Sequence, residues 1–93
     1  MPDAQPSTVA VELFGIPRAR AGVAQATARG TCLGDVFEDL ARQYPGLAEH
    51  CIDGRRLRTG FTANLGSERF VTAPETPIPF GATVLLLSLD AGG

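Results

Sequence analysis

The sequence contains no lysine and no tryptophan, and it has only two cysteines, one methionine, one tyrosine and one histidine in 93 residues. All eight basic residues are arginines, so the N-terminus is the only primary amine and the chain cannot receive a lysine-linked modifier. No apolar run approaches the roughly 20 residues that span a bilayer, and residues 1–7 do not resemble a signal peptide. We therefore expect no membrane association and a cytoplasmic location.

A basic excess is also absent, because ten acidic residues outnumber eight basic ones and the net charge is −2. Binding to nucleic acid would require clustered positive charge, so we expect no nucleic-acid partner. A hydrophobic content of 44% and a charged content of 19% are typical of a small globular domain. The length predicts one such domain.

Cysteine and histidine are too few for a disulfide framework or a zinc site. Two cysteines are fewer than a disulfide framework normally uses, so Cys32 and Cys51 are predicted to be reduced thiols. Together with His50 they do not supply four zinc ligands, and we predict no metal. Cys32 is either a reactive thiol at a helix start or, more commonly, a small buried residue. Adjacent side chains point apart, which argues against a Cys51–His50 dyad.

Two further sets of residues have both a structural and a functional interpretation. Core or core-edge packing is the default for Phe14, Phe61, Phe70 and Phe80, and the alternative is a partner surface. A short basic run is by default a solvated loop, and the alternative is a contact with an acidic partner for Arg55, Arg56 and Arg58.

Alternation of apolar and polar residues predicts an N-terminal hairpin. Residues 8–15 have the period of a strand, and residues 23–30 alternate in the same way but more weakly. The stretch between them carries Pro17 and Gly22 and is predicted to be a turn. Residues 1–7 are polar, contain two prolines and are predicted to be a flexible tail.

The strongest signal is an amphipathic helix from Thr31 to Tyr44. Its apolar stripe consists of Leu33, Val36, Phe37, Leu40, Ala41 and Tyr44. Thr31 is the predicted N-cap, acidic residues in the N-terminal half suit the helix dipole, and Pro45 and Gly46 end the helix. Residues 47–56 are a mixed connection with room for one short helical turn.

Three more strands are predicted in the C-terminal part of the chain. Residues 57–72 give two short strands about a turn formed by Asn64 and Gly66. Residues 73–81 carry three prolines and form a loop. Residues 82–90 are apolar on both faces, as is typical of a central strand, often one with a parallel neighbour.

The order strand, strand, helix, strand, strand, strand indicates the fold class. A hairpin laid against a helix, with the last strand returning beside the first, is the β-grasp architecture, and right-handed crossovers leave few other solutions. We predict an α+β domain over residues 8–89, with a mixed sheet of about five strands packed against one main helix.

This element order, "LFGIPRARAG" after the first strand, the "T…L…L…YP" helix, the "ANLG" hairpin and the final "AGG" resemble the MoaD/ThiS sulfur-carrier family. That family has a ubiquitin-like β-grasp fold, and the resemblance extends from Val9 to Gly93. Residues 14–22 and the overall length are more similar to the MoaD branch, which includes molybdopterin synthase small subunits.

The resemblance implies a role for the last residues. In the family the terminal glycine is adenylated and converted to a thiocarboxylate, which here assigns that chemistry to Gly93. Leu89, Asp90, Ala91 and Gly92 would be the segment that enters a partner's channel, with residues 90–93 mobile. Glycine permits a close backbone approach, and an extended segment reaches roughly 15 Å at about 3.3 Å per residue.

The same resemblance implies the partners: a ThiF/MoeB-like adenylating enzyme that uses ATP, a sulfur donor, and a biosynthetic enzyme that accepts sulfur for molybdopterin, cysteine or another metabolite. The chain itself would be a protein co-substrate or a small subunit of a sulfur-transfer complex, with no bound cofactor and no enzymatic activity. Asp90 departs from the prolines or small aliphatic residues common before the glycines, which leaves the partner's identity open. Two alternatives are a ubiquitin-like modifier conjugated through Gly93 and a β-grasp interaction module with no role for its glycines.

Overall fold

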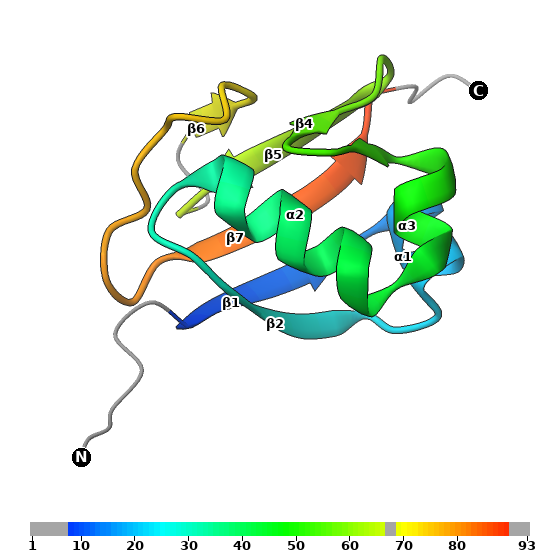
Figure 1. Cartoon of the computed structure of the whole chain (residues 1–93), viewed down its shortest axis with the longest axis horizontal. Helices are drawn as coiled ribbons and strands as arrows, with labels where there is room; N and C mark the ends of the chain where they lie inside the picture. The colour runs from blue at the N-terminus through cyan, green and yellow to red at the C-terminus, as the bar shows by residue number, and fades with distance from the viewer. Residues whose placement is uncertain (1–7, 67–68, 90–93) are drawn as a thin grey trace.

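The computed structural model describes residues 8–66 and 69–89, so the predictions for the tails at residues 1–7 and 90–93 lie outside the described residues. One mixed five-stranded sheet forms the centre of the molecule (Figure 1). In sheet order its strands are β2 (Gln25–Arg29), β1 (Thr8–Leu13), β7 (Thr83–Ser88), β5 (Phe61–Leu65) and β6 (Arg69–Val71). β1 and β7 are parallel, and the other neighbours are antiparallel.

β7 is the central strand, as its apolar sequence predicts. Val84 and Leu86 are fully buried on the face that α2 covers, whereas Leu85 and Leu87 are half-buried on the opposite face. The parallel pairing of β7 with β1 aligns Leu86 with Leu13. The predicted central position and parallel neighbour of the last strand are both confirmed.

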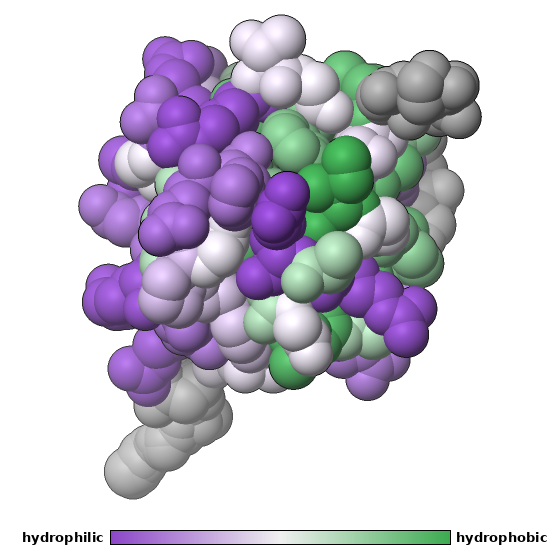
Figure 2. All heavy atoms as spheres, turned by 90° about the vertical axis from the view of Figure 1, so that its right-hand side faces the viewer, coloured by the Kyte–Doolittle hydropathy of each residue, from purple (hydrophilic) through white to green (hydrophobic). Residues whose placement is uncertain are grey.

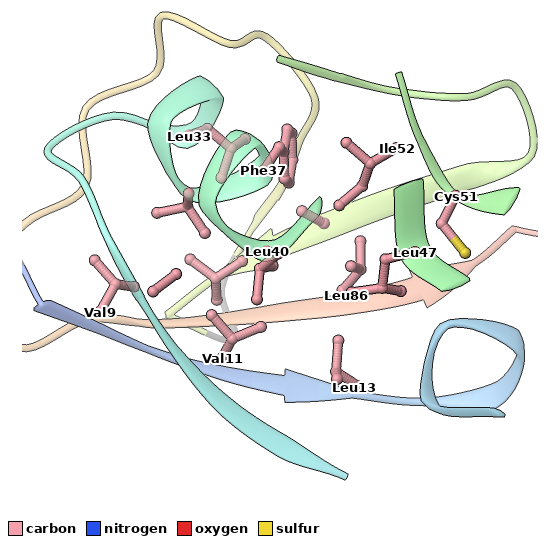
Figure 3. Close-up of a cluster of buried hydrophobic side chains, with 14 of the residues drawn as sticks. Val9, Val11, Leu13, Leu33, Phe37, Leu40, Leu47, Cys51, Ile52 and Leu86 are labelled. Atoms are coloured by element: carbon pink, nitrogen blue, oxygen red, sulfur yellow. The ribbon is translucent and has the colours of Figure 1, made fainter. Parts of the chain in front are cut away.

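The main helix, α2 (Leu33–Gln43), lies across one face of the sheet (Figure 1). Its predicted stripe faces the sheet: Leu33, Val36, Phe37 and Leu40 are fully buried, and Tyr44, just past the helix end, is half-buried. In Figure 3 the side chains of α2 meet those of β1 and β7 in one continuous cluster. The α+β fold with one main helix on a mixed sheet is therefore confirmed.

The connection between β1 and β2 is a helix, α1 (Gly15–Ala21), so the predicted turn is wrong although the hairpin itself is confirmed. Proline is tolerated in a first helical turn because the amides there lack intrahelical partners. Pro17 occupies this turn and is buried. Gly22 ends the helix in the left-handed conformation, with φ +84°, and its N–H donates to the carbonyl of Arg18.

The predicted mixed connection is more regular than expected. It contains α3 (Pro45–His50) and a small separate hairpin of β3 (Ile52–Asp53) and β4 (Arg56–Leu57). Pro45 does end α2, but it also occupies the first turn of α3, where its missing N–H costs nothing. A Cβ at Gly46 would lie 2.1 Å from the carbonyl oxygen of Arg20, so α3 packs directly on the backbone of α1.

The start of α2 also differs from the prediction. Cys32, not Thr31, is the N-cap, and it makes no side-chain capping bond. Instead the Thr31 amide donates to the Asp35 carboxylate at 3.2 Å. Asp39 is buried and accepts from the Arg29 amide at 2.9 Å and from the Arg42 guanidinium, so it ties α2 to β2 rather than serving the helix dipole.

Among the described residues, every helix is too short or too polar to cross a membrane.

Candidate functional site

The functional tail predicted from the sequence begins where β7 ends. Leu89 is the one predicted tail residue that the structure describes, whereas Asp90, Ala91, Gly92 and Gly93 lie outside the described residues. The Leu89 amide donates to the carbonyl of Gly60 at 2.7 Å, so its backbone is still held by the sheet. Its side chain is 61% exposed. The last described residue is therefore anchored at the end of the central strand.

A hollow of about 570 Å³ lies beside this point. Leu89 lines it together with Gly60 and Phe61, and Arg56 and Arg58 contribute positive charge. Glu75 lines the same hollow and offsets part of that charge.

A second surface lies on the face of the sheet that α2 leaves uncovered. We call it the outer patch, and it consists of Phe14, Asn64, Phe70, Leu85 and Leu87, which line a shallow hollow of about 320 Å³. Figure 2 views the end of the molecule near α1 and α3, where hydrophilic side chains dominate one side and hydrophobic ones gather in the middle and towards the other side. Leu87 belongs to the outer patch and is only two residues from Leu89, so the patch adjoins the end of β7.

The phenylalanines divide between the two interpretations. Phe61 is half-buried and packs against the core, as the default predicts. Phe14 and Phe70 are 42% and 66% exposed and belong to the outer patch, so neither is a buried core residue. Phe80 is 85% exposed at the opposite end of β7, in the loop that precedes it.

Asn64 is not a turn residue, so that prediction is wrong. It lies within β5, where it pairs in register with Leu85 of β7 and Phe70 of β6. The residue is 8% exposed. The turn propensity of asparagine led the sequence-based prediction away from this strand position inside an apolar patch.

The arginines of the predicted basic run have different partners in the structure. Arg55 donates to Asp35 at 3.0 Å and to Glu38 at 3.2 Å, and it also lies 3.6 Å from the Cys32 sulfur. Arg58 donates to the carbonyl of Ala48 at 2.9 Å. Arg55 and Arg58 thus have structural partners.

The position of Cys51 argues against a role as a nucleophile. Cys51 is fully buried, and burial raises the pKa of its thiol, which therefore stays protonated at neutral pH. His50 lies 3.7 Å from the carboxylate of Glu49. Cys32 is half-buried at the start of α2, and both cysteines are free thiols.

The charged cluster at the start of α2 makes the free energy of unfolding depend slightly on pH. The Thr31 amide, and next the Arg55 guanidinium, lower the pKa of Asp35. A carboxyl with a lowered folded-state pKa stabilises the fold above its unfolded pKa of about 3.9, and that contribution is lost as the pH falls through the folded value.

We predict that Asp35→Asn lowers the free energy of unfolding at neutral pH by about 0.5 kcal/mol or less, because the ion pair is partly exposed and screened by solvent. The difference from the wild type should vanish in the acid range. Urea unfolding at a series of pH values measures both effects. Asp53→Asn is the matched control, since this exposed aspartate makes no ion pair within the described residues. A difference that stayed constant down to pH about 2 would contradict the assigned ionisation.

Comparison with solved structures supports the fold assignment. The small archaeal modifier protein 1 (SAMP1) from Methanosarcina acetivorans superposes with a TM-score of 0.74 at 21% identity, over 94% of this chain and 97% of that one. SAMP1 from Haloferax volcanii gives 0.75 at 18% identity, over 92% and 99%. A chain of the Amycolatopsis orientalis BexX/CysO complex gives 0.74 at 20% identity, over 91% and 99%.

No protein-family model and no curated protein matches the sequence. The structural likeness therefore defines the fold: the chain is a ubiquitin-like β-grasp protein, like the neighbours to which it is similar. The β-grasp fold predicted from the sequence is therefore confirmed.

Proposed function

We propose that this chain is a sulfur carrier whose Gly93 carboxylate is activated and converted to a thiocarboxylate. The observation that carries the proposal is the anchoring of Leu89, the last described residue, at the end of the central strand. Leu89 is held by Gly60, and the residues that follow are small except for Asp90. A terminus of this kind reaches a buried active site of another protein without disturbing the fold.

The chemistry would proceed in two steps. A carboxylate oxygen of Gly93 attacks the α-phosphorus of ATP, which forms an acyl adenylate and releases pyrophosphate. Sulfide, the simplest donor, then attacks the carbonyl carbon and displaces AMP, leaving a thiocarboxylate. The first step exchanges a poor leaving group for a good one, and the partner enzyme supplies the active site for both steps. The chain is thus a co-substrate rather than an enzyme.

The partners are those that the family resemblance implies: a ThiF/MoeB-like adenylating enzyme, a sulfur donor and a sulfur-accepting biosynthetic enzyme. The similarity to a chain of the BexX/CysO complex supports a protein partner. We place this exchange in the cytoplasm and further propose that residues 90–93 are mobile in the free protein.

A second candidate is a ubiquitin-like modifier, since two of the similar structures are named small archaeal modifier proteins. In that case the activated Gly93 carbonyl would form an isopeptide bond with a lysine of another protein. The absence of lysine in this chain prevents chains of the modifier linked through its own lysines.

Intact-mass spectrometry separates the two functions. The chain is incubated with ATP, sulfide and the adenylating enzyme of the organism that encodes it, and a carrier gains the mass of one oxygen-for-sulfur exchange. A modifier instead appears as adducts on lysines of other proteins when a cell extract is added. A chain that shows neither product is an interaction module, and the carrier proposal is then wrong.

A further inference from the structure

β2 forms one edge of the sheet (Figure 1). The Leu13 amide donates to the Ala24 carbonyl at 2.8 Å, and the antiparallel register continues from this pair along β1 and β2. Because backbone groups alternate in direction along an antiparallel strand, the N–H and C=O groups of Gln25, Thr27 and Arg29 point away from β1. No further strand pairs with them within the described residues.

Two side chains of α2 close the half of this edge around Arg29. The Asp39 carboxylate accepts from the Arg29 amide at 2.9 Å. The Gln43 side-chain amide donates to the Thr27 carbonyl at 2.8 Å and to Asp39 at 3.1 Å, so the two side chains hold each other in place. An exposed strand edge is a template for pairing with another chain, and proteins normally protect it. Asp39 and Gln43 supply this protection for one half of β2.

The other half of the edge has no such cap. The N–H and C=O groups of Gln25 and the N–H group of Thr27 have no hydrogen-bond partner in the described parts of the chain. Both side chains are uncharged and exposed, and residues 25–27 contain no proline. The usual protections of an edge, which include proline and charged side chains, are therefore missing here. The contrast within one short strand indicates that this half is left open for an incoming strand.

We infer that residues 25–27 of β2 bind an extended segment of a partner protein, which adds to the sheet as a further strand. The backbone of such a segment supplies partners for the three open groups, as in strand addition generally. This contact goes beyond the sulfur chemistry proposed for Gly93. It leaves the terminus accessible, because β1 lies between β2 and β7.

The hollow beside this half of β2 defines the side chains that suit the segment. Its volume is about 440 Å³, and Glu12, Ala26 and Tyr44 are among the residues that line it. Glu12 lies opposite Gln25 and makes no ion pair within the described residues, and none of the described arginines lines the hollow. Successive side chains of a strand point to opposite faces. The segment therefore carries a basic side chain beside Glu12, alternating with an apolar one beside Ala26 and Tyr44.

The test begins with a displayed library of random short peptides selected on the immobilised full chain, and the strongest binder is synthesised with blocked ends. Thr27→Pro removes the outward N–H group but no ladder bond to β1, and proline is tolerated at such an edge position. We expect the Kd for the peptide, measured by calorimetry, to increase about tenfold or more, because one peptide carbonyl loses its donor. Thr27→Ala is the matched control, since it keeps the N–H group and should bind like the wild type.

Hydrogen exchange is a second readout that needs no variant. In the free wild type the amides of Gln25 and Thr27 should exchange faster than the amide of Arg29, which Asp39 caps. The bound peptide should slow exchange at Gln25 and Thr27. Glu12→Gln should weaken binding by about two- to fivefold at low salt, because the basic side chain of the peptide loses an exposed ion pair.

A library that yields no binder would overturn the inference, and so would a peptide that Thr27→Pro and Thr27→Ala bind equally well. Protection of amides on β6 in place of β2 would do the same. Sedimentation in which the wild type alone pairs through β2 would identify a second copy as the occupant and would also overturn it. A wild-type chain that binds the peptide but gains no sulfur would contradict the proposed function alone.

Discussion

Deleting Gly93 is expected to abolish sulfur loading while leaving the thermal midpoint of the protein almost unchanged. The shortened chain still ends in a glycine with a free carboxylate, so the chemistry available at its terminus is the same. What changes is position, because the carboxylate moves inward by about 3.3 Å. A misplacement of only about 1 Å can cost about a hundredfold in rate. The deletion therefore tests the reach of the tail separately from its chemistry.

The measurement is the rate of the oxygen-for-sulfur mass change, taken beside a melting curve for each variant. An extension by one residue beyond Gly93 should also prevent loading, since a peptide bond replaces the reactive carboxylate. Gly92→Ala keeps the carboxylate but adds a Cβ that narrows the approach, and we expect slower loading without loss of stability. If the chain without Gly93 were loaded at the normal rate, the terminus would not be the site of function.

Local patterns were sufficient to predict the main sheet and α2, because each is set by the burial of one face. The alternation in β1 and the stripe of α2 appear directly in the burial of Val11, Leu13, Phe37 and Leu40. The apolar run of β7 predicted its central position, although Leu85 and Leu87 lie on the face that α2 leaves uncovered and are only half-buried.

The connections could not be predicted in the same way. Proline and glycine in residues 15–22 indicate a turn, yet proline is also common at the start of a helix and glycine just after its end. In α1, Pro17 lies in the first turn and Gly22 ends the helix. The short α3 has only six residues, too few to be stable alone, and its place depends on close packing of Gly46 against the carbonyl of Arg20. That contact joins segments far apart in the sequence and leaves no local pattern.

The outer patch was missed for a related reason. Its members come from β5, β6, β7 and the N-cap of α1, which directly follows β1, so only the strand order brings them together. The signal that could have found Asn64 is its place in the alternation of residues 61–65, where it falls on the same face as Thr62 and opposite Ala63 and Leu65. Turn propensity outweighed that alternation in the sequence-based prediction.

Leu40→Ala should cause the largest loss of stability among the changes considered. Leu40 is fully buried between α2 and the sheet, and its side chain belongs to the continuous cluster of Figure 3. Truncation removes buried methyl groups and leaves a cavity, which costs about 2–5 kcal/mol. For a domain of this size each kcal/mol lowers the thermal midpoint by about 4–8 °C. Calorimetric or circular-dichroism melting measures the shift.

Phe80→Ala is the matched control, because it removes a larger side chain that is 85% exposed and should change stability by no more than about 0.5 kcal/mol. Equal losses for the two variants would mean that α2 does not cover the sheet through Leu40. Leu40→Ala should also load sulfur at the wild-type rate when assayed well below its lowered midpoint, since Leu40 contacts neither Leu89 nor the outer patch. The opposite responses of Leu40→Ala and the Gly93 deletion would then separate the core, which holds the sheet, from the terminus, which carries the chemistry.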